Sequence, residues 1–254
     1  MKNMNNNIWN KKIKDNFNYA AKNYSKHSLI QKHFTKQILS IINELNISDG
    51  DWVDLGAGTG FLADEIEKYF INKVSRLDIC NNMLLLNKNG SNKILWDLNK
   101  GLHPSIKNPS LLVSNFCIHW LREPKRNLEE WFKKLNKGGK LIISYPTNNC
   151  FPEWKTTCKN YGIEYSGLIF PEEKKMIKNF LSSEIISSKN FLYKENYPNI
   201  YKLFRSIINI GAQSSKSKKN SVGDFKKLAQ YWPTDKYKKV NLTWEINILA
   251  LQKI

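Results

Sequence analysis

Short apolar runs alternate with amphipathic stretches along most of this chain. The apolar runs predict buried strands, and the amphipathic stretches, with apolar residues three or four positions apart, predict helices. The predicted strands lie at 52–55, 73–78, 93–97, 110–114, 140–144, 190–195 and 240–251. The predicted helices lie at 61–69, 82–87, 128–135 and 198–210. This alternation is typical of βαβ units, so the sequence predicts an α/β fold with a doubly wound, mostly parallel, seven-stranded sheet.

Three stretches depart from the alternation. Residues 13–47 have apolar positions at helical spacing and predict an N-terminal helical cap, whereas the polar residues 1–12 are expected to fray. Residues 148–183 are mixed, aromatic and basic, and predict a helical, lid-like insertion over the ligand edge of the sheet. The Lys/Ser run at 214–221 is expected to form a mobile surface loop. We therefore expect residues 1–254 to form a single domain with a cap and a lid.

The chain is strongly basic, with a formal net charge of +18 and a pI of about 9.6. Such a charge favours a partner that is a nucleic acid, an anionic lipid or an acidic protein. The basic residues are nearly all lysine, however, and Asn and Ile are abundant, as AT-rich codons would produce. Because nucleic-acid readers rely on bidentate arginine, we interpret the charge mainly as a compositional bias.

Other bulk features favour a cytoplasmic protein without a metal. The chain starts with polar residues rather than a signal peptide, and no apolar segment approaches the ~18–20 residues of a membrane span. The four cysteines and four histidines have no metal-binding or redox spacing. We expect the cysteines to be reduced and unpaired.

A glycine-rich loop follows the first predicted strand. Gly56, Gly58 and Gly60 alternate directly after Asp54, and glycine lets the backbone turn and come close to a ligand. A dinucleotide fingerprint would have glycine at position 61, where this chain has Phe61. The Gly-x-Gly-x-Gly form resembles motif I of the class I S-adenosylmethionine (SAM) methyltransferases. Taken alone, the loop is also compatible with a turn that binds nothing.

Acidic residues also end the next two predicted strands. Asp78 is placed to accept hydrogen bonds from both ribose hydroxyls of an adenosine, and Asp97 from the adenine amino group. Each carboxylate alone is more often a surface or capping residue, but their order together with motif I favours SAM. The remaining candidate cofactor residues are two apolar side chains for the adenine faces and the pair that ends the fourth strand: Met83, Leu98, Ser114 and Asn115.

The fourth strand end argues against several substrates. Its sequence, Ser114-Asn115-Phe116-Cys117, lacks the Asn/Asp-Pro-Pro-aromatic motif of enzymes that methylate exocyclic adenine nitrogens. The chain has no Pro-Cys nucleophile of the cytosine C5 enzymes, and no carboxylate cluster for magnesium-dependent methylation of phenols stands out. A nucleic-acid substrate is therefore disfavoured.

A more specific pattern lies in the segments 13–17, 20–24, 25–31, 77–79, 83–84, 114–120, 204–207, 210–212 and 242–244. These segments are similar to one family, the malonyl-acyl carrier protein O-methyltransferases of biotin synthesis. The resemblance covers nearly the whole chain. The chain departs from the family at His119, where glutamine is expected, and at the turn Gly138-Gly139.

The resemblance implies methyl transfer from SAM to the free carboxylate of a malonyl thioester on acyl carrier protein. The methyl ester then serves as the primer for the pimeloyl moiety of biotin. A carboxylate is already ionised and nucleophilic, so no residue is required as a general base. Catalysis is expected to come from alignment and desolvation of the reactants.

The candidate substrate residues follow from this reaction. The planar guanidinium of Arg205 suits a carboxylate, and Tyr24 is a candidate for closing over the cofactor or orienting the substrate. Trp120 and His27 are further candidates, for which packing or capping is the alternative, and Gln31 is expected on a solvated face. An acidic carrier protein would meet a basic rim, for which the candidates are Lys155, Lys159, Lys174, Lys175 and Lys178. We expect a monomer that binds neither nucleic acid nor membrane.

Three alternatives stay open at this point. A SAM-dependent methyltransferase of another small acid or metabolite would have the same motif I. A carrier-binding module without catalysis is disfavoured because all the predicted cofactor acids and glycines are present. An RNA methyltransferase drawn by charge alone lacks the expected motifs.

Overall fold

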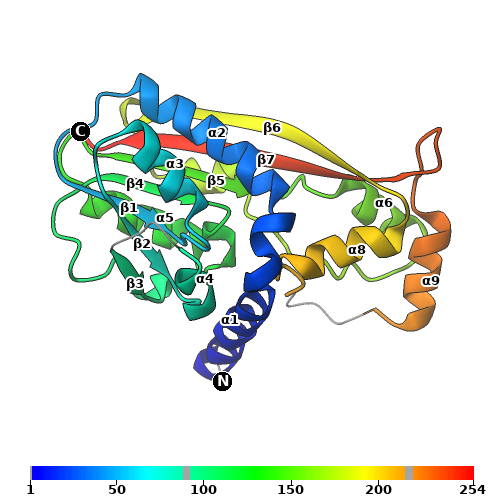
Figure 1. The fold of residues 1–254 in the computed structure, drawn as a ribbon. Coiled ribbons are helices and arrows are strands. Elements are labelled where there is room, and N and C mark those ends of the chain that lie inside the picture. The colour runs from blue at the N-terminus through cyan, green and yellow to red at the C-terminus, as the bar shows by residue number, and fades with distance from the viewer. Residues whose placement is uncertain (1, 88–91, 215–219) are drawn as a thin grey trace.

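Seven strands form one sheet in the computed structural model, which describes residues 2–87, 92–214 and 220–254. The strand order is β3-β2-β1-β4-β5-β7-β6 (Figure 1). The strands are β1 (Asp51–Leu55), β2 (Val74–Asp78), β3 (Lys93–Leu95), β4 (Pro109–Asn115), β5 (Lys140–Pro146), β6 (Ile185–Tyr197) and β7 (Val240–Gln252). The central part of the predicted mobile loop, 215–219, lies outside the described residues.

The strand directions confirm a mostly parallel, doubly wound sheet. β1 pairs in parallel with β2 and β4, and the parallel pairing continues to β3 on one side and β5 on the other. β7 pairs antiparallel with both β5 and β6, so β6 shares the direction of the first five strands. The order of the strands reverses between β1 and β4, and ligands of such sheets bind at this switch point.

Apolar side chains alternate between the two faces of the sheet, as the two-residue period of a strand requires. In β4, Leu111 and Val113 belong to one core and Leu112 to the other. The first core includes side chains of α2 (Leu29–Glu44) and α3 (Phe61–Tyr69). The second includes side chains of α5 (Pro124–Lys134), so helices cover both faces.

The N-terminal helix α1 spans Lys2–His27 and points away from the sheet in Figure 1. It packs against α4 (Asn81–Leu85) and α8 (Ile200–Asn209). The prediction that residues 1–12 fray is therefore wrong from Lys2 onward. Trp9 is buried and its Nε1 donates to the carbonyl oxygen of Trp120 (3.4 Å), and such tertiary packing stabilises a helix beyond its intrinsic propensity.

Helices also gather at one end of the long β6–β7 pair (Figure 1). The insertion at 148–183 contains α6 (Pro152–Asn160) and α7 (Glu173–Ile177), and α6 packs against β7 and α9 (Val222–Tyr231). The sequence interpretation missed α9, although Ser221 and Asp224 form the capping box that marks its start. Among the described residues, none of the helices has the length and apolar character to cross a membrane.

Candidate cofactor and acceptor site

The loop between β1 and α3 turns sharply at its glycines. Gly56, Gly58 and Gly60 have φ of 78°, 54° and 85°, in the region that favours glycine. A Cβ on Gly56 would overlap the side chain of Cys117. The N–H of Gly56 donates to the carbonyl oxygen of Leu77 (2.8 Å), which fixes the loop to the end of β2. The glycine backbone therefore lies at the switch point of the sheet.

Asp78 ends β2 beside this loop. Its Oδ2 accepts a hydrogen bond from the N–H of Gly58 (2.8 Å), and its Oδ1 accepts one from the N–H of Cys80 (2.7 Å). Burial raises the pKa of the Asp78 carboxyl, and the backbone N–H donors oppose that shift. The two bonds hold the carboxylate in one orientation.

A cavity with about 710 Å³ of empty space, a figure that includes its open mouth, lies over these strand ends. Asp97 lies on its wall and caps the short 3-10 turn η1 (Leu98–Lys100) by accepting from the N–H of Asn99 (2.9 Å). The predicted cofactor residues that line this cavity are Gly56, Gly58, Asp78, Met83, Asp97, Leu98 and Asn115. We call it the cofactor cavity.

Asn10 also lines this cavity, and the sequence interpretation missed it. Its Nδ2 donates to Oδ2 of Asp97 (3.0 Å), while its Oδ1 is buried and has no hydrogen-bond partner among the described residues. No sequence signal points to this residue, because α1 reaches the cavity only through tertiary packing.

Asp54 lies in a smaller adjoining cavity together with Gly56 and Gly58. Burial raises the pKa of the Asp54 carboxyl to about 7, the cation of Arg76 opposes this shift and the charge of Asp78 adds to it. Oδ2 of Asp54 is buried and has no hydrogen-bond partner among the described residues. Asp54 is therefore a buried acceptor directly before the glycine loop.

A second, larger cavity adjoins the first, with about 1640 Å³ of empty space that includes its open mouth. Phe17, Tyr24, Phe116 and Trp120 line both cavities and form the boundary between them. The rest of the larger cavity is mainly aromatic and aliphatic. Its apolar lining includes Phe151, Trp154, Leu168, Phe170, Phe204, Ile207, Phe225, Leu228 and Trp244. We call it the acceptor cavity.

The sequence model of one family, described as a methyltransferase domain, matches residues 30–189. The chain belongs to this methyltransferase family. Its curated relatives include the malonyl-[acyl-carrier protein] O-methyltransferase of Buchnera aphidicola subsp. Baizongia pistaciae, which is 27% identical over 88% of this chain and 91% of that protein. The protein of the same name from Bacillus anthracis is 22% identical over 80% of this chain and 81% of the relative.

Solved methyltransferase structures resemble the fold. A putative methyltransferase from Bacillus halodurans C-125 has a TM-score of 0.59 at 12% identity, covering 86% of this chain and 99% of that one. A SAM-dependent methyltransferase from Thermotoga maritima, described as a possible histamine N-methyltransferase, has a TM-score of 0.51 at 15% identity, covering 93% and 99%. At these identities the likeness extends to the fold alone.

SAM is the cofactor of this methyltransferase, and the residues present fit it. SAM offers hydrogen-bond donors in its ammonium, ribose hydroxyls and adenine amino group, and the buried oxygens of Asp54 and Asn10 are unpartnered acceptors. When bound, SAM supplies an electrophilic methyl group on a sulfonium. Among the described residues, no cluster of His, Cys, Asp or Glu could hold a metal ion.

Two predicted cofactor residues line none of these cavities within the described chain. Gly60 precedes α3 and packs against Arg76 and Asn87, which would overlap a Cβ at this position. The hydroxyl of Ser114 donates to the carbonyl oxygen of Leu55 (2.8 Å) and joins β4 to β1. We infer that both residues stabilise the backbone around the cofactor site without lining it.

The predicted substrate residues do not all meet at one place. Tyr24 and Trp120 lie at the boundary of the two cavities. Arg205 is exposed on α8 and His27 is half-buried near the end of α1, and neither is among the described residues that line the acceptor cavity. Gln31, which was expected on a solvated face, lines the acceptor cavity instead, and its Oε1 is buried without a partner among the described residues.

The titratable aromatic groups of the acceptor cavity are held neutral. Burial lowers the pKa of His119 to about 3, and its ring contacts Phe116, Trp120 and Phe170. Burial, with the nearby charge of Asp78, raises the pKa of Tyr24 well above its usual value. Neither side chain has a pKa near neutral, where a general base works best.

Replacing His119 with glutamine is expected to reduce the acid sensitivity of this methyltransferase. The pKa of His119 is lower in the folded protein than in the unfolded chain. The contribution of the neutral ring to the free energy of unfolding is therefore fully present above the unfolded-state pKa. It is lost as the pH falls toward the folded-state pKa of about 3. Between neutral pH and about pH 4.5, the wild type should lose roughly 2 kcal/mol more than H119Q. Urea unfolding at both pH values measures the difference. His103→Gln, a change outside both cavities, is the control and should lose as much as the wild type.

Proposed function

We propose that this methyltransferase transfers the methyl group of SAM to the free carboxylate of a malonyl thioester carried by an acyl carrier protein. The product, a malonyl-carrier methyl ester, has its charge masked and serves as the primer for the pimeloyl moiety of biotin. Curated relatives named for this reaction align over most of the chain, which supports the proposal. Their low identity makes a separate argument from the site necessary.

The observation that carries the proposal is the charge of the side chains that line the acceptor cavity. No acidic side chain occurs among the described residues that line it, so an entering carboxylate meets no repelling charge there. His119 and Tyr24 are held neutral by burial, which leaves no aromatic side chain with a pKa suited to deprotonating an alcohol or an ammonium group. A carboxylate arrives already ionised and needs no base.

The chain itself contributes alignment and exclusion of water. Phe17, Tyr24, Phe116 and Trp120 separate the cofactor cavity from the acceptor cavity, so the methyl donor and the carboxylate would meet among aromatic rings. Such walls remove water from the carboxylate and increase its reactivity. Holding the two reactants in line can supply up to roughly 7–11 kcal/mol of the barrier.

We keep Arg205 as the candidate that first binds the acceptor's carboxylate, at the rim of the acceptor cavity. Its neighbours Phe204 and Ile207 on α8 line that cavity, while Arg205 itself is exposed. A guanidinium at the rim would attract the carboxylate without trapping it inside.

The deciding experiment is methyl transfer from labelled SAM to malonyl-acyl carrier protein. Malonyl-CoA, free malonate and RNA serve as competing acceptors. We expect label on the carrier-bound thioester in preference to all three. Label on malonate alone would support a methyltransferase of small acids, and label on RNA would overturn the acceptor assignment. Label on no acceptor, despite measured SAM binding, would favour the binding module without catalysis.

Exposed lysines of the insertion are candidates for docking an acidic carrier protein. Lys155 is half-buried, and burial lowers its pKa, so it is less suited to this role. The exposed members are Lys159, Lys174, Lys175 and Lys178. Opposite charges on two partners increase the encounter rate and fix the orientation.

Reversing these four exposed lysines to glutamate is expected to raise KM for the malonyl-carrier protein about 10-fold at low salt. Turnover of a malonyl thioester of a small thiol should change less than about 2-fold, since that acceptor has no acidic surface. Steady-state kinetics at two salt concentrations measure both. The control is the same reversal at the amino ends of the parallel strands, at Lys73, Lys93, Lys107 and Lys137. Equal effects of the two sets would contradict docking at the insertion.

We further propose that the enzyme acts as a monomer in the cytoplasm and does not bind nucleic acid or membrane. All four cysteines are unpaired, which suits a reducing compartment. Sedimentation of the purified protein, alone and with RNA, tests the oligomeric state and the nucleic-acid part of the proposal.

A further inference from the structure

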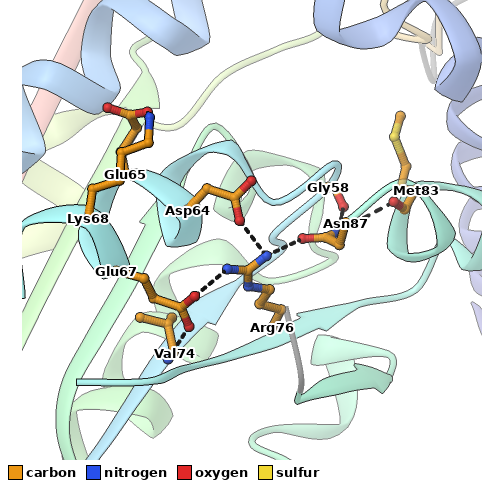
Figure 2. Close-up of polar contacts among 9 residues, drawn as sticks. All are labelled: Gly58, Asp64, Glu65, Glu67, Lys68, Val74, Arg76, Met83 and Asn87. Atoms are coloured by element: carbon orange, nitrogen blue, oxygen red, sulfur yellow. Dashed lines mark hydrogen bonds and ion pairs between the residues drawn. The ribbon is translucent and has the colours of Figure 1, made fainter. Parts of the chain in front are cut away.

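Arg76 is a fully buried cation on β2, directly behind the glycine loop (Figure 2). Its Nη1 lies 2.7 Å from Oδ1 of Asp64 and its Nη2 lies 3.0 Å from Oε2 of Glu67. Both acids belong to α3, the helix that follows the loop. A buried charge is costly unless it is paired, so these two ion pairs fix the position of the guanidinium.

Asn87 connects this guanidinium to the loop. Nη1 of Arg76 donates to Oδ1 of Asn87 (3.1 Å), and Nδ2 of Asn87 donates to the carbonyl oxygen of Gly58 (2.7 Å) and, more weakly, to that of Met83 (3.3 Å), as Figure 2 shows. Asn87 is fully buried. Because a guanidinium has only donors, it requires the amide oxygen to face it, and the amide NH₂ group must then face Gly58.

Gly58 is therefore held through both of its backbone polar groups. Its carbonyl oxygen accepts from Asn87, and its N–H donates to Asp78. Gly58 and Asp78 line the cofactor cavity, whereas Arg76 and Asn87 do not. The absence of a side chain on Gly60 leaves the space that Asn87 and Arg76 fill.

We propose that Asn87, oriented by Arg76, is a positioning residue that holds the Gly58 backbone in its cofactor-binding conformation before SAM arrives. A loop fixed in advance loses less conformational entropy on binding, so the affinity for the cofactor is higher. The role concerns cofactor affinity rather than the chemical step. It does not depend on which acceptor the enzyme uses.

Two substitutions separate positioning from folding. Asn87→Ala removes the bond to Gly58, and the Kd for S-adenosylhomocysteine should rise about 10-fold. Asn87→Asp retains an acceptor for Arg76 but places a carboxylate oxygen against the Gly58 carbonyl. Its Kd should rise at least as much, although its ion pair with Arg76 preserves the melting temperature. Isothermal calorimetry and thermal unfolding measure these values. KM for SAM should rise in both variants while kcat stays within about 2-fold of the wild type.

Asn247→Ala is the matched control. Asn247 is also a fully buried asparagine, but its Nδ2 donates to Ser188 and Asn190 at the β6–β7 pair, away from the cofactor cavity. This variant should lose stability and keep the wild-type Kd for S-adenosylhomocysteine. The proposal is overturned if Asn247→Ala weakens binding as much as Asn87→Ala. It is also overturned if Asn87→Asp binds S-adenosylhomocysteine as tightly as the wild type. Because the readout is cofactor binding, failure of the malonyl-carrier assignment leaves this test unaffected.

Discussion

Asp78→Asn is expected to weaken cofactor binding by at least about 100-fold, since charged hydrogen bonds contribute roughly 1.5–3 kcal/mol each. The carboxylate accepts from the N–H groups of Gly58 and Cys80, and we propose that it also receives the ribose hydroxyls. An asparagine would have no charge, and an NH₂ group would replace one of the two carboxylate oxygens. That NH₂ group would face the N–H of Gly58 or Cys80, so two hydrogen-bond donors would oppose each other. The melting temperature should also fall, because the buried N–H of either Gly58 or Cys80 loses its acceptor.

Calorimetric titration with S-adenosylhomocysteine and with its 2′-deoxy analogue measures this effect. The wild type should discriminate between the two ligands, and Asp78→Asn should not. Asp224→Asn is the control, because Asp224 lines neither cavity and caps α9 through a similar bond to a backbone N–H. If Asp78→Asn still preferred the ribose form, the assignment of the ribose hydroxyls to Asp78 would be wrong.

Tyr24→Ala is expected to lower kcat about 100-fold, while the Kd for S-adenosylhomocysteine rises only a few-fold. Tyr24 lies at the boundary of the cofactor and acceptor cavities, where removal of its ring admits water and loosens the alignment of donor and acceptor. Tyr24→Phe retains the ring and should keep most of the activity if the ring alone is needed. Stopped assays with the malonyl-carrier protein give kcat and KM.

Phe225→Ala provides the comparison for Tyr24. Phe225 lines the acceptor cavity but not the cofactor cavity, so its loss should raise KM for the acceptor and leave kcat nearly unchanged. A larger fall in kcat for Phe225→Ala than for Tyr24→Ala would contradict the alignment role of Tyr24.

The cofactor-binding residues can be predicted from the sequence because they lie at the ends of predicted strands. Gly58, Asp78 and Asp97 each follow a short apolar run, and parallel strands bring their carboxyl ends to one edge. The hydrophobic pattern alone therefore predicts that these residues lie close together. Gly60 shows the limit of this reasoning, since it belongs to the motif but packs against Arg76 and Asn87 instead of lining the cavity.

The acceptor side is less accessible because its residues come from distant segments without a shared pattern. Gln31 was expected on a solvated face and Arg205 in contact with the substrate, yet Gln31 lines the acceptor cavity and Arg205 is exposed. Asn10 reaches Asp97 across the chain only because α1 packs over the strand ends. A helix periodicity shows which positions share a face but not which partner that face meets.

The sequence by itself determined the α/β alternation, the glycine loop and the carboxylates at the strand ends, because these follow from local periodicity and chain direction. Only the tertiary structure decided how that loop is held and which side chains line the acceptor cavity. The hydrogen bond from Asn87 to Gly58 depends on packing between elements far apart in sequence, and so does the presence of Tyr24 and Trp120 at one cavity boundary. Burial, which lowers the pKa of His119 and raises the pKa of Asp54, is likewise a property of the folded chain.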